Sequence, residues 1–340
     1  MLNDFSISKE MVKKILKDNY DILTSSVEII NRGSANIFLI NKNEYILKEF
    51  QLKYESQDII KEVKILEHLK IDGINVPTFI KTKEGKYYFL HEKHIVILEK
   101  YIEGETIKRN TANKSLLISS ACYLGKIIKS LQTLSFSLPV NKINEIMSVT
   151  KINEGIAKID ALLKKVPRNI YPDIYNDLHD KRNILQGFKN LNFDNFSKVT
   201  IMNTHGDYGI EQLIIKNHKI KAVLDFASAS KMPIIWEIIR SYSYIDSKAK
   251  EGTINISNLV KYVCAFSKYV KLNYYDLLYM VNMYSMQIAM STYGYKEYIN
   301  DNANKELLNF AVFRTKLLKN MVANEKNITS ALINNVNYQN

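Results

Sequence analysis

The sequence contains little cysteine, no glycine repeat and no long hydrophobic run. Its two cysteines, Cys122 and Cys264, lie far apart and belong to no paired motif, which excludes a disulfide scaffold and a cysteine-based zinc site. We therefore expect a reduced, cytoplasmic compartment. No segment reaches the ~18 apolar residues that a membrane-spanning helix needs. The N-terminal segment carries acidic residues early and lacks an apolar core, so we expect neither a secretory signal nor a membrane partner.

The composition is that of a globular protein with a basic surface. The chain has 340 residues, which suggests two domains or one composite domain at ~100–200 residues each. Its 47 Lys and Arg residues exceed its 35 Asp and Glu residues, a balance that can attract nucleic acid, anionic membranes or phosphorylated ligands. Because these basic residues are spread along the chain without a run, we favour a solvated basic surface and expect no nucleic-acid partner.

The hydrophobic pattern changes character near residue 104. The β-rich first part predicts a domain at 1–103, and the mostly helical remainder predicts a second domain at 104–340. In the first part, the pattern predicts an opening helix and then a series of strands around a second helix. The expected strands are 27–30, 37–40, 45–50, 87–90 and 95–98, with the second helix at 58–70. In the second part we expect helices at 115–134 and across 141–195, a hairpin at 213–225, and helices from about 233 onward.

A small-residue turn followed by a lysine and an acid forms the first candidate constellation. The turn 32–36 reads Arg-Gly-Ser-Ala-Asn, and Lys48 follows in the next predicted strand. Backbone N–H groups in such a turn can approach phosphate oxygens, and a lysine on a strand can pair with them. An ordinary hairpin explains the turn equally well. Glu62 could pair with Lys48 or be an exposed helix charge. The sequence has no Walker A or G-x-G-x-x-G motif, so a dinucleotide-binding fold is not expected.

Two aspartates on either side of a predicted hairpin form the strongest constellation. Asp207 follows an apolar run in the segment Thr-His-Gly-Asp of residues 204–207, and Asp225 ends the hairpin. Loops and strand ends are where functional sites are usually built. We expect the two carboxylates to converge, one acting on a hydroxyl nucleophile and the other on Mg²⁺, which prefers oxygen ligands.

These segments together resemble the aminoglycoside phosphotransferase and choline kinase-like family. The resemblance rests on His205-Gly206-Asp207 with Gln212 five residues later, on Asp225-Phe226, and on the preceding lysine and acid. Residues 233–240 are similar to a helix in members related to spore-coat kinases. The resemblance implies an α+β, protein-kinase-like bilobal fold with a small β-rich N-lobe and a larger, mainly helical C-lobe. It also implies transfer of the γ-phosphate of ATP, with Mg²⁺, to a hydroxyl of a small molecule such as an antibiotic, a sugar or another metabolite.

The resemblance also assigns roles to individual residues. Asp207 corresponds to the catalytic base, and Asp225 with Gln212 to the metal ligands. The segment 99–101 corresponds to the hinge whose backbone meets the adenine. The residues that would bind the nucleotide are Arg32, Gly33, Ser34, Asn36, Lys48, Glu62, Glu99 and Tyr101.

Two departures from the family pattern bear on activity. Gln212 replaces the usual asparagine, and its extra methylene fixes the amide oxygen less well. A packing histidine is also absent at Gln132. The alternative to a kinase is therefore a catalytically degenerate binding or structural protein, for example one associated with a spore surface. We expect His205 to organise the loop, and His91 and His94 to be surface residues.

The composition of residues 271–304 bears on the chemical class of the acceptor. This segment is rich in tyrosine and methionine and has few acidic residues, whereas carboxylates would complement a polycationic aminoglycoside. Helical spacing favours a packed core over a ligand pocket. If part of this segment lines the site, an uncharged or aromatic acceptor, or a sugar, fits it better than an aminoglycoside.

Overall fold

The computed structural model describes residues 6–32 and 35–339 and divides the chain into two compact units. The first unit comprises Met1–Thr106, Thr133–Ser135 and Gln212–Ser228, and the second comprises Ile107–Gln132, Phe136–Glu211 and Ala229–Asn340. The first boundary lies close to the expected change near residue 104. The hairpin segment 212–228 differs from the sequence-based division, because it packs with the first unit although we expected it in the second domain.

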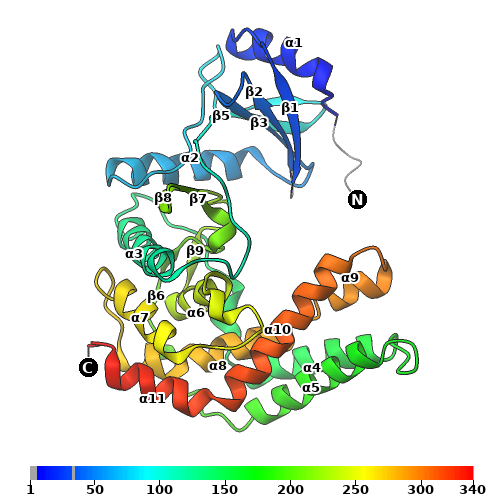
Figure 1. Cartoon of the computed structure of the whole chain (residues 1–340), viewed down its shortest axis with the longest axis vertical. Helices are drawn as coiled ribbons and strands as arrows, with labels where there is room; N and C mark the ends of the chain where they lie inside the picture. Colours follow the sequence, from blue (N-terminus) through cyan, green and yellow to red (C-terminus); the bar gives the residue numbers. More distant parts are fainter. Residues whose placement is uncertain (1–5, 33–34, 340) are drawn as a thin grey trace. The chain divides into compact units, whose positions relative to one another are not determined.

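A five-stranded antiparallel sheet with the order β1-β2-β3-β5-β4 forms the centre of the first unit (Figure 1). Its strands are β1 (Val27–Arg32), β2 (Ala35–Ile40), β3 (Tyr45–Phe50), β4 (Phe89–His91) and β5 (His94–Lys100). Helix α1 (Lys9–Tyr20) buries its apolar side against this sheet, and Leu16 belongs to the same buried hydrophobic cluster as Phe38 and Leu47. The predicted opening helix and strands are confirmed. Within the segment 32–36 that we expected to be a turn, Arg32 belongs to β1, and Ala35 and Asn36 belong to β2.

A fully buried carboxylate, Glu49, joins the sheet to the segment that precedes α1. Glu49 accepts hydrogen bonds from the backbone N of Ser6 at 2.6 Å and of Ile7 at 3.2 Å. It also accepts one from Asn36 Nδ2 at 3.0 Å. These bonds satisfy a charge that would otherwise be costly in the interior. Successive residues of a strand face opposite sides, so Asn36 and Glu49 lie on the face of the sheet that is opposite to Lys48.

The expectation that His94 is a surface residue is wrong, because its exposed fraction is 4%. Strand β5 lies between β3 and β4, so its side chains are covered from both neighbours. His94 Nδ1 lies 2.8 Å from the Phe50 carbonyl oxygen and 4.0 Å from Glu49 Oε1. The histidine therefore belongs to the interior polar cluster around Glu49.

A helix and a hairpin complete the first unit. Helix α2 (Ser56–Ile71) confirms the predicted helix at 58–70. Strands β7 (Leu213–Lys216) and β8 (Lys219–Val223) form the predicted hairpin, whose turn residues Asn217 and His218 have φ angles of 51° and 58°. Such angles are those of a two-residue turn that matches the twist of the strands. Because β8 ends at Val223, Asp225 lies in the loop beyond the strand.

The second unit is mainly helical (Figure 1). Its helices are α3 (Lys114–Leu131), α4 (Val149–Leu163), α5 (Pro172–Phe188), α6 (Ile234–Ile245), α7 (Ile256–Phe266), α8 (Tyr274–Met290), α9 (Tyr295–Asn300), α10 (Lys305–Ala323) and α11 (Glu325–Asn335). Short 3₁₀ turns are η1 (Lys142–Glu145), η2 (Phe196–Lys198), η3 (Ile210–Gln212) and η4 (Ser247–Ala249). A two-stranded antiparallel ribbon pairs β6 (Ile201–Thr204) with β9 (Ser230–Pro233). In this ribbon Thr204 pairs with Ser230, so the loop that carries Asp207 begins at the end of a fixed strand.

Helix α8 forms the core of the second unit, packed against α4, α5, α6, α10 and α11. Met280, Met283 and Tyr284 on this helix are fully buried. The tyrosine- and methionine-rich segment is thus mostly core, as its helical spacing predicted, although Tyr274 and Tyr293 are exposed. Within the described residues, no helix is long and apolar enough to cross a membrane.

Candidate active site

Lys48 forms an ion pair inside the first unit. Its Nζ atom lies 2.9 Å from Oε1 and 2.8 Å from Oε2 of Glu99. Lys48 is on β3 and Glu99 on β5, and the register aligns Ile46 with Glu99, so the two charged residues are diagonal neighbours on one face. Burial by itself lowers the pKa of Lys48, but the Glu99 carboxylate, together with the charges of Glu62 and Asp225, outweighs this effect and the pKa is raised. The lysine is therefore held as a cation.

Glu62 on α2 is buried close to this pair. Its Oε1 atom accepts a hydrogen bond from the backbone N of Phe226 at 3.1 Å. Burial raises the pKa of Glu62 to about 7, and the nearby Lys48 ammonium opposes that rise. We expected Glu62 to pair with Lys48. In the structure the carboxylate that contacts Lys48 is Glu99, while Glu62 acts on the lysine through its charge and supports the backbone after Asp225.

Asp225 has a left-handed backbone that both flanking amides hold in place. Its φ angle is 63°, a conformation that is uncommon for residues other than glycine, asparagine and aspartate. On one side, the Leu224 N donates to the Gln212 carbonyl oxygen at 2.8 Å, and on the other the Phe226 N donates to Glu62. Strained backbone of this kind is concentrated at functional sites. The two predicted metal ligands, Gln212 and Asp225, are thereby linked.

Four predicted site residues come together in the first unit. The Asp225 carboxylate raises the pKa of both Lys48 and Glu62, which places its charge within electrostatic reach of theirs. Glu99 is the fourth member. One lysine among three carboxylates leaves an excess of negative charge that a divalent cation complements. The exposed Asp225 carboxylate and the Gln212 amide carry oxygens of the kind that Mg²⁺ prefers.

No cluster of three or more His, Cys, Asp or Glu side chains suited to a metal ion occurs in the described ranges. Mg²⁺ is commonly held by one or two carboxylates together with water and substrate phosphates rather than by a full protein cage. The donor set around Asp225 fits this mode of binding. It would hold a cation that arrives with a nucleotide.

Asp207 lies in the second unit on a loop that side chains of α6 hold by hydrogen bonds. The Asp207 backbone N donates to Nδ1 of the buried His205 at 3.3 Å. The Asp207 carboxylate forms an ion pair with Arg240, which also donates to the Tyr208 carbonyl oxygen at 3.2 Å. Glu237 accepts from the Tyr208 N at 3.0 Å. Asp207 keeps 38% of its side chain exposed, so its carboxylate is oriented and still accessible.

Arg240 and Glu237 are site residues that sequence reasoning did not assign. They are three residues apart on α6, which places them on the same side of the helix. Burial raises the pKa of Glu237. The segment Trp236–Arg240 resembles a helix of the family, but the sequence does not indicate that this helix packs against the loop of Asp207.

The remaining nucleotide-binding candidates are less completely described. Gly33 and Ser34 lie outside the described residues, and Arg32 ends β1. The Asn36 side chain binds Glu49 on the face of the sheet away from Lys48. In the expected hinge, the Lys100 N donates to Thr78 O and the Tyr101 N donates to Glu44 O, each at 2.9 Å. These two amides are therefore engaged within the first unit.

Comparisons with known proteins identify the family and the fold. The model of the phosphotransferase enzyme family, APH, matches residues 26–255. A search of curated proteins finds no match. An aminoglycoside phosphotransferase from Alicyclobacillus acidocaldarius has a similar structure, with a TM-score of 0.64 and 11% identity over 97% of this chain and 100% of that chain.

Two further solved structures are similar over most of their length. The amicoumacin kinase hAmiN, in complex with AMP-PNP, Ca²⁺ and Ami, has a TM-score of 0.60 and 13% identity, covering 92% of this chain and 94% of that chain. The microcompartment-associated aminopropanol kinase has a TM-score of 0.60 and 12% identity, covering 93% and 98%. These likenesses confirm the expected protein-kinase-like α+β fold, with a small β-rich part and a larger helical part.

Proposed function

The chain belongs to the phosphotransferase enzyme family and is a small-molecule kinase, and from this premise we propose that it transfers the γ-phosphate of ATP to a hydroxyl group, with Asp207 as base and Asp225 on Mg²⁺. The observation that carries the proposal is that two groups of side chains lie at the positions that the sequence predicted. One comprises a charged lysine beside Asp225, and the other comprises an accessible, oriented Asp207. Phosphoryl transfer needs little covalent chemistry from the protein, and these residues supply positioning and charge.

The residues of the first unit would bind the donor. Lys48 presents an ammonium to the phosphates, and its pair with Glu99 keeps that ammonium ionised. Asp225, with the Gln212 amide, would hold Mg²⁺, which supplies neutralisation of charge on the phosphate oxygens. Glu62 fixes the backbone at Phe226 and thereby the direction of the neighbouring Asp225. The structure of the amicoumacin kinase, solved with AMP-PNP and Ca²⁺, supports an ATP donor and a divalent cation.

Asp207 would act on the acceptor. Its carboxylate would accept the proton of the hydroxyl as that oxygen attacks the γ-phosphorus, while the bond from this phosphorus to the bridging oxygen breaks and ADP leaves. A positioned base of this type typically contributes ~10²–10⁴-fold to the rate. Arg240 binds the carboxylate oxygen Oδ1 and so fixes the orientation of the base. The loop geometry set by His205 and Glu237 keeps the base in one orientation.

The surroundings of Asp207 favour an uncharged or anionic acceptor over a polycation. Arg240 lies over the rings of Trp236, at 5.2 Å, and Tyr244, at 5.1 Å. Arg109 pairs with Glu211 and stacks 4.1 Å from the centroid of Phe310. Because each of these guanidinium groups is paired with a carboxylate, the surroundings offer no excess negative charge to a cationic acceptor, while the rings and N–H groups offer flat faces and donors to aromatic or hydroxyl-rich ones. We therefore place sugars and aromatic alcohols ahead of aminoglycosides.

Metal-dependent stabilisation by ATP tests the donor side. The thermal midpoint of the full chain is measured with ATP and Mg²⁺ and with ATP and a chelator. We expect a rise with Mg²⁺ that Asp225→Ala abolishes and Asp207→Asn retains. Absence of any metal-dependent rise in the wild-type protein contradicts the proposal.

Transfer assays test the base. In a screen of sugars, aromatic alcohols and aminoglycosides, Asp207→Asn is expected to lower kcat by ~10²–10⁴-fold with little change in stability. A wild-type protein that binds Mg·ATP but transfers to no acceptor, and in which Gln212→Asn creates metal-dependent turnover, would instead be a degenerate relative. Efficient phosphorylation of kanamycin-like compounds would overturn the acceptor assignment.

A further inference from the structure

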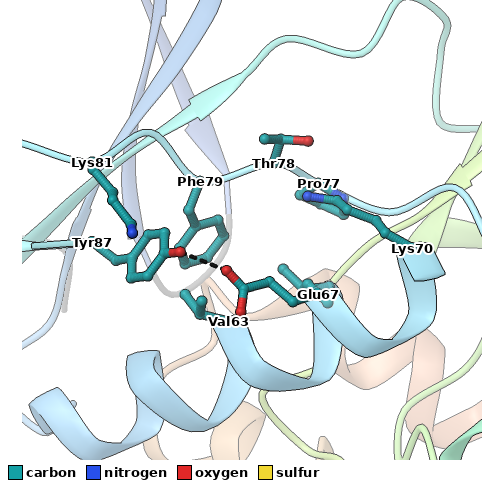
Figure 2. A pocket seen from close by; sticks show the side chains of 9 residues that line it. Val63, Glu67, Lys70, Pro77, Thr78, Phe79, Lys81 and Tyr87 are labelled. Carbon is teal, nitrogen blue, oxygen red and sulfur yellow. Dashed lines mark hydrogen bonds between the residues drawn. The ribbon is translucent and has the colours of Figure 1, made fainter. Parts of the chain in front are cut away.

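A cavity of about 230 Å³ lies in the first unit, and none of the residues assigned to the active site lines it (Figure 2). One wall is the side of α2 that carries Val63, Leu66 and Lys70, and the other is the segment from Pro77 to Tyr87. The volume exceeds the ~150 Å³ that takes up a benzene molecule and is below the ~300 Å³ at which drug-sized sites begin. It suits one ring with a short substituent.

The floor of the cavity is apolar. Val63 and Leu66 are buried on α2, one turn apart, and Phe79 is buried on the facing segment. In Figure 2 the Phe79 ring stands between the two walls. An apolar group placed here would contact aliphatic and aromatic carbon on both sides, which is a favourable environment for burial.

The rim of the cavity is basic. Lys70 extends over Pro77 from α2, and Lys81 lies 4.9 Å from the centroid of the Tyr87 ring (Figure 2). The acid at the rim, Glu67, already accepts a hydrogen bond from Tyr87 Oη at 2.5 Å. Among the described residues no hydrogen bond or ion pair engages the Lys70 ammonium. The charges of Glu67 and Glu99 act on Lys70, but the lining itself holds two lysines, Lys70 and Lys81, and one acid. This excess of positive charge at the edge of an apolar cavity is complementary to an anionic group.

We propose that this cavity is an effector site for a single-ring or similarly compact apolar molecule with one carboxylate or phosphate group. The apolar part would fill the space above Phe79, and the anionic group would pair with Lys70 and Lys81. An anionic group at the rim is the part of the ligand with which both ammonium groups would interact.

The walls of the cavity connect it to the donor site. Val63 follows Glu62 directly on α2, and Glu62 holds the amide of Phe226. On the other wall, Phe79 forms a β-bridge with Glu99, which holds Lys48. A ligand that fixes the spacing of α2 and the facing segment therefore fixes the supports of Lys48 and Asp225. We expect it to change the affinity for Mg·ATP, and this part rests on the proposed function.

Calorimetric titration of the full chain tests binding. The probes are phenylacetate and phenyl phosphate, with neutral 2-phenylethanol and cationic phenethylamine as matched comparisons. We expect the anions to bind with Kd of about 0.1–1 mM and the amine not to bind. Lys70→Gln should weaken anion binding about tenfold, and Thr78→Phe, which fills the cavity from an exposed position, should abolish it. Lys64→Gln, an exposed lysine on the same helix outside the cavity, is the control.

Equal binding of the anions by wild type, Lys70→Gln and Thr78→Phe, with thermal midpoints showing all three folded, would overturn the site. The preferred anion distinguishes a carboxylate from a phosphate ligand. With the cavity saturated, the Kd of Mg·ATP should shift about fivefold, and the effect must be reciprocal. An unchanged Kd would overturn the effector role. A wild-type protein that does not bind Mg·ATP would count against the proposed function, and the Lys70 and Thr78 comparisons would still decide the site.

Discussion

Glu62 places a carboxyl group out of contact with water while Lys48, Glu99 and Asp225 act on it through their charges. Its pKa of about 7 lies above the ~4.3 of a carboxyl group in an unfolded chain. Between these values the folded protein binds the proton more tightly. The stability that Glu62 contributes is therefore complete at low pH and is lost as the pH rises to about 7.

Replacing Glu62 with glutamine should remove this pH dependence. Glutamine keeps the oxygen that accepts from Phe226 and carries no titratable proton. We expect the stability of the wild type relative to Glu62→Gln to fall between pH 5 and pH 7 and to level off above. Chemical unfolding at a series of pH values measures the difference. A difference that rises with pH would contradict the assignment.

Arg240 contacts two atoms of the catalytic loop, Asp207 Oδ1 and the Tyr208 carbonyl oxygen. A lysine cannot reproduce this forked contact. We expect Arg240→Lys to lower kcat about 10–100-fold, because a small displacement of the base is costly, and to leave the KM for ATP unchanged.

Steady-state kinetics separates these two constants. The control is Arg182→Lys. Arg182 is on α5, outside the site, and pairs with Asp160. An Arg240→Lys enzyme with wild-type kcat would show that Asp207 needs no support from α6.

At the scale of elements, the start of α9 depends on a close approach to α10. Gly294 has a φ angle of 92°, and a Cβ atom there would lie 2.3 Å from the Leu307 carbonyl oxygen. A side chain would be strained by the backbone angle and would also collide with α10. Gly294→Ala should therefore destabilise the protein by about 2–4 kcal/mol.

Differential scanning calorimetry checks this value against Gly187→Ala. Gly187 lies within α5 with open space at its Cβ position, so alanine there should be neutral or stabilise by about 0.5–1 kcal/mol. Equal midpoints for the two variants would show that α9 can move away from α10.

Local pattern was sufficient for most elements but not for the pairings that build the site. The strand-forming residues of Tyr45–Phe50 predicted β3, and the aspartates at 207 and 225 stood out by residue type and spacing. The Lys48–Glu99 pair depends on the register between β3 and β5, which are separated by α2. The contact of Arg240 with Asp207 depends on how α6 packs. Neither is encoded in a short stretch of sequence.

At the scale of the whole molecule, buried charge adds a second pH dependence. Lys181 on α5 is 1% exposed, and its Nζ donates to the Ser291 carbonyl oxygen at 2.6 Å, just beyond α8. Burial, together with the charge of Arg314, lowers the pKa of Lys181 to about 7, below the ~10.4 of an unfolded lysine. Between these values the unfolded chain binds more protons, so the stability rises with pH.

The comparison of wild type with Lys181→Met isolates this effect. We expect the stability of the wild type relative to the variant to increase from pH 7 to pH 10, whereas Lys189→Met, an exposed change just after α5, should give a constant difference. Thermal unfolding over this pH range provides the measurement. A flat difference for Lys181→Met would mean that the buried amine stays charged.

Glu49 has a practical consequence for anyone shortening the chain. The amides of Ser6 and Ile7 are two of the donors that make its buried carboxylate tolerable on the sheet. A shortened chain that begins after Ser6 would lose a donor to this buried carboxylate. We expect that loss to destabilise β3, the strand that bears Lys48. Removal of these N-terminal residues would then lower the affinity for the nucleotide.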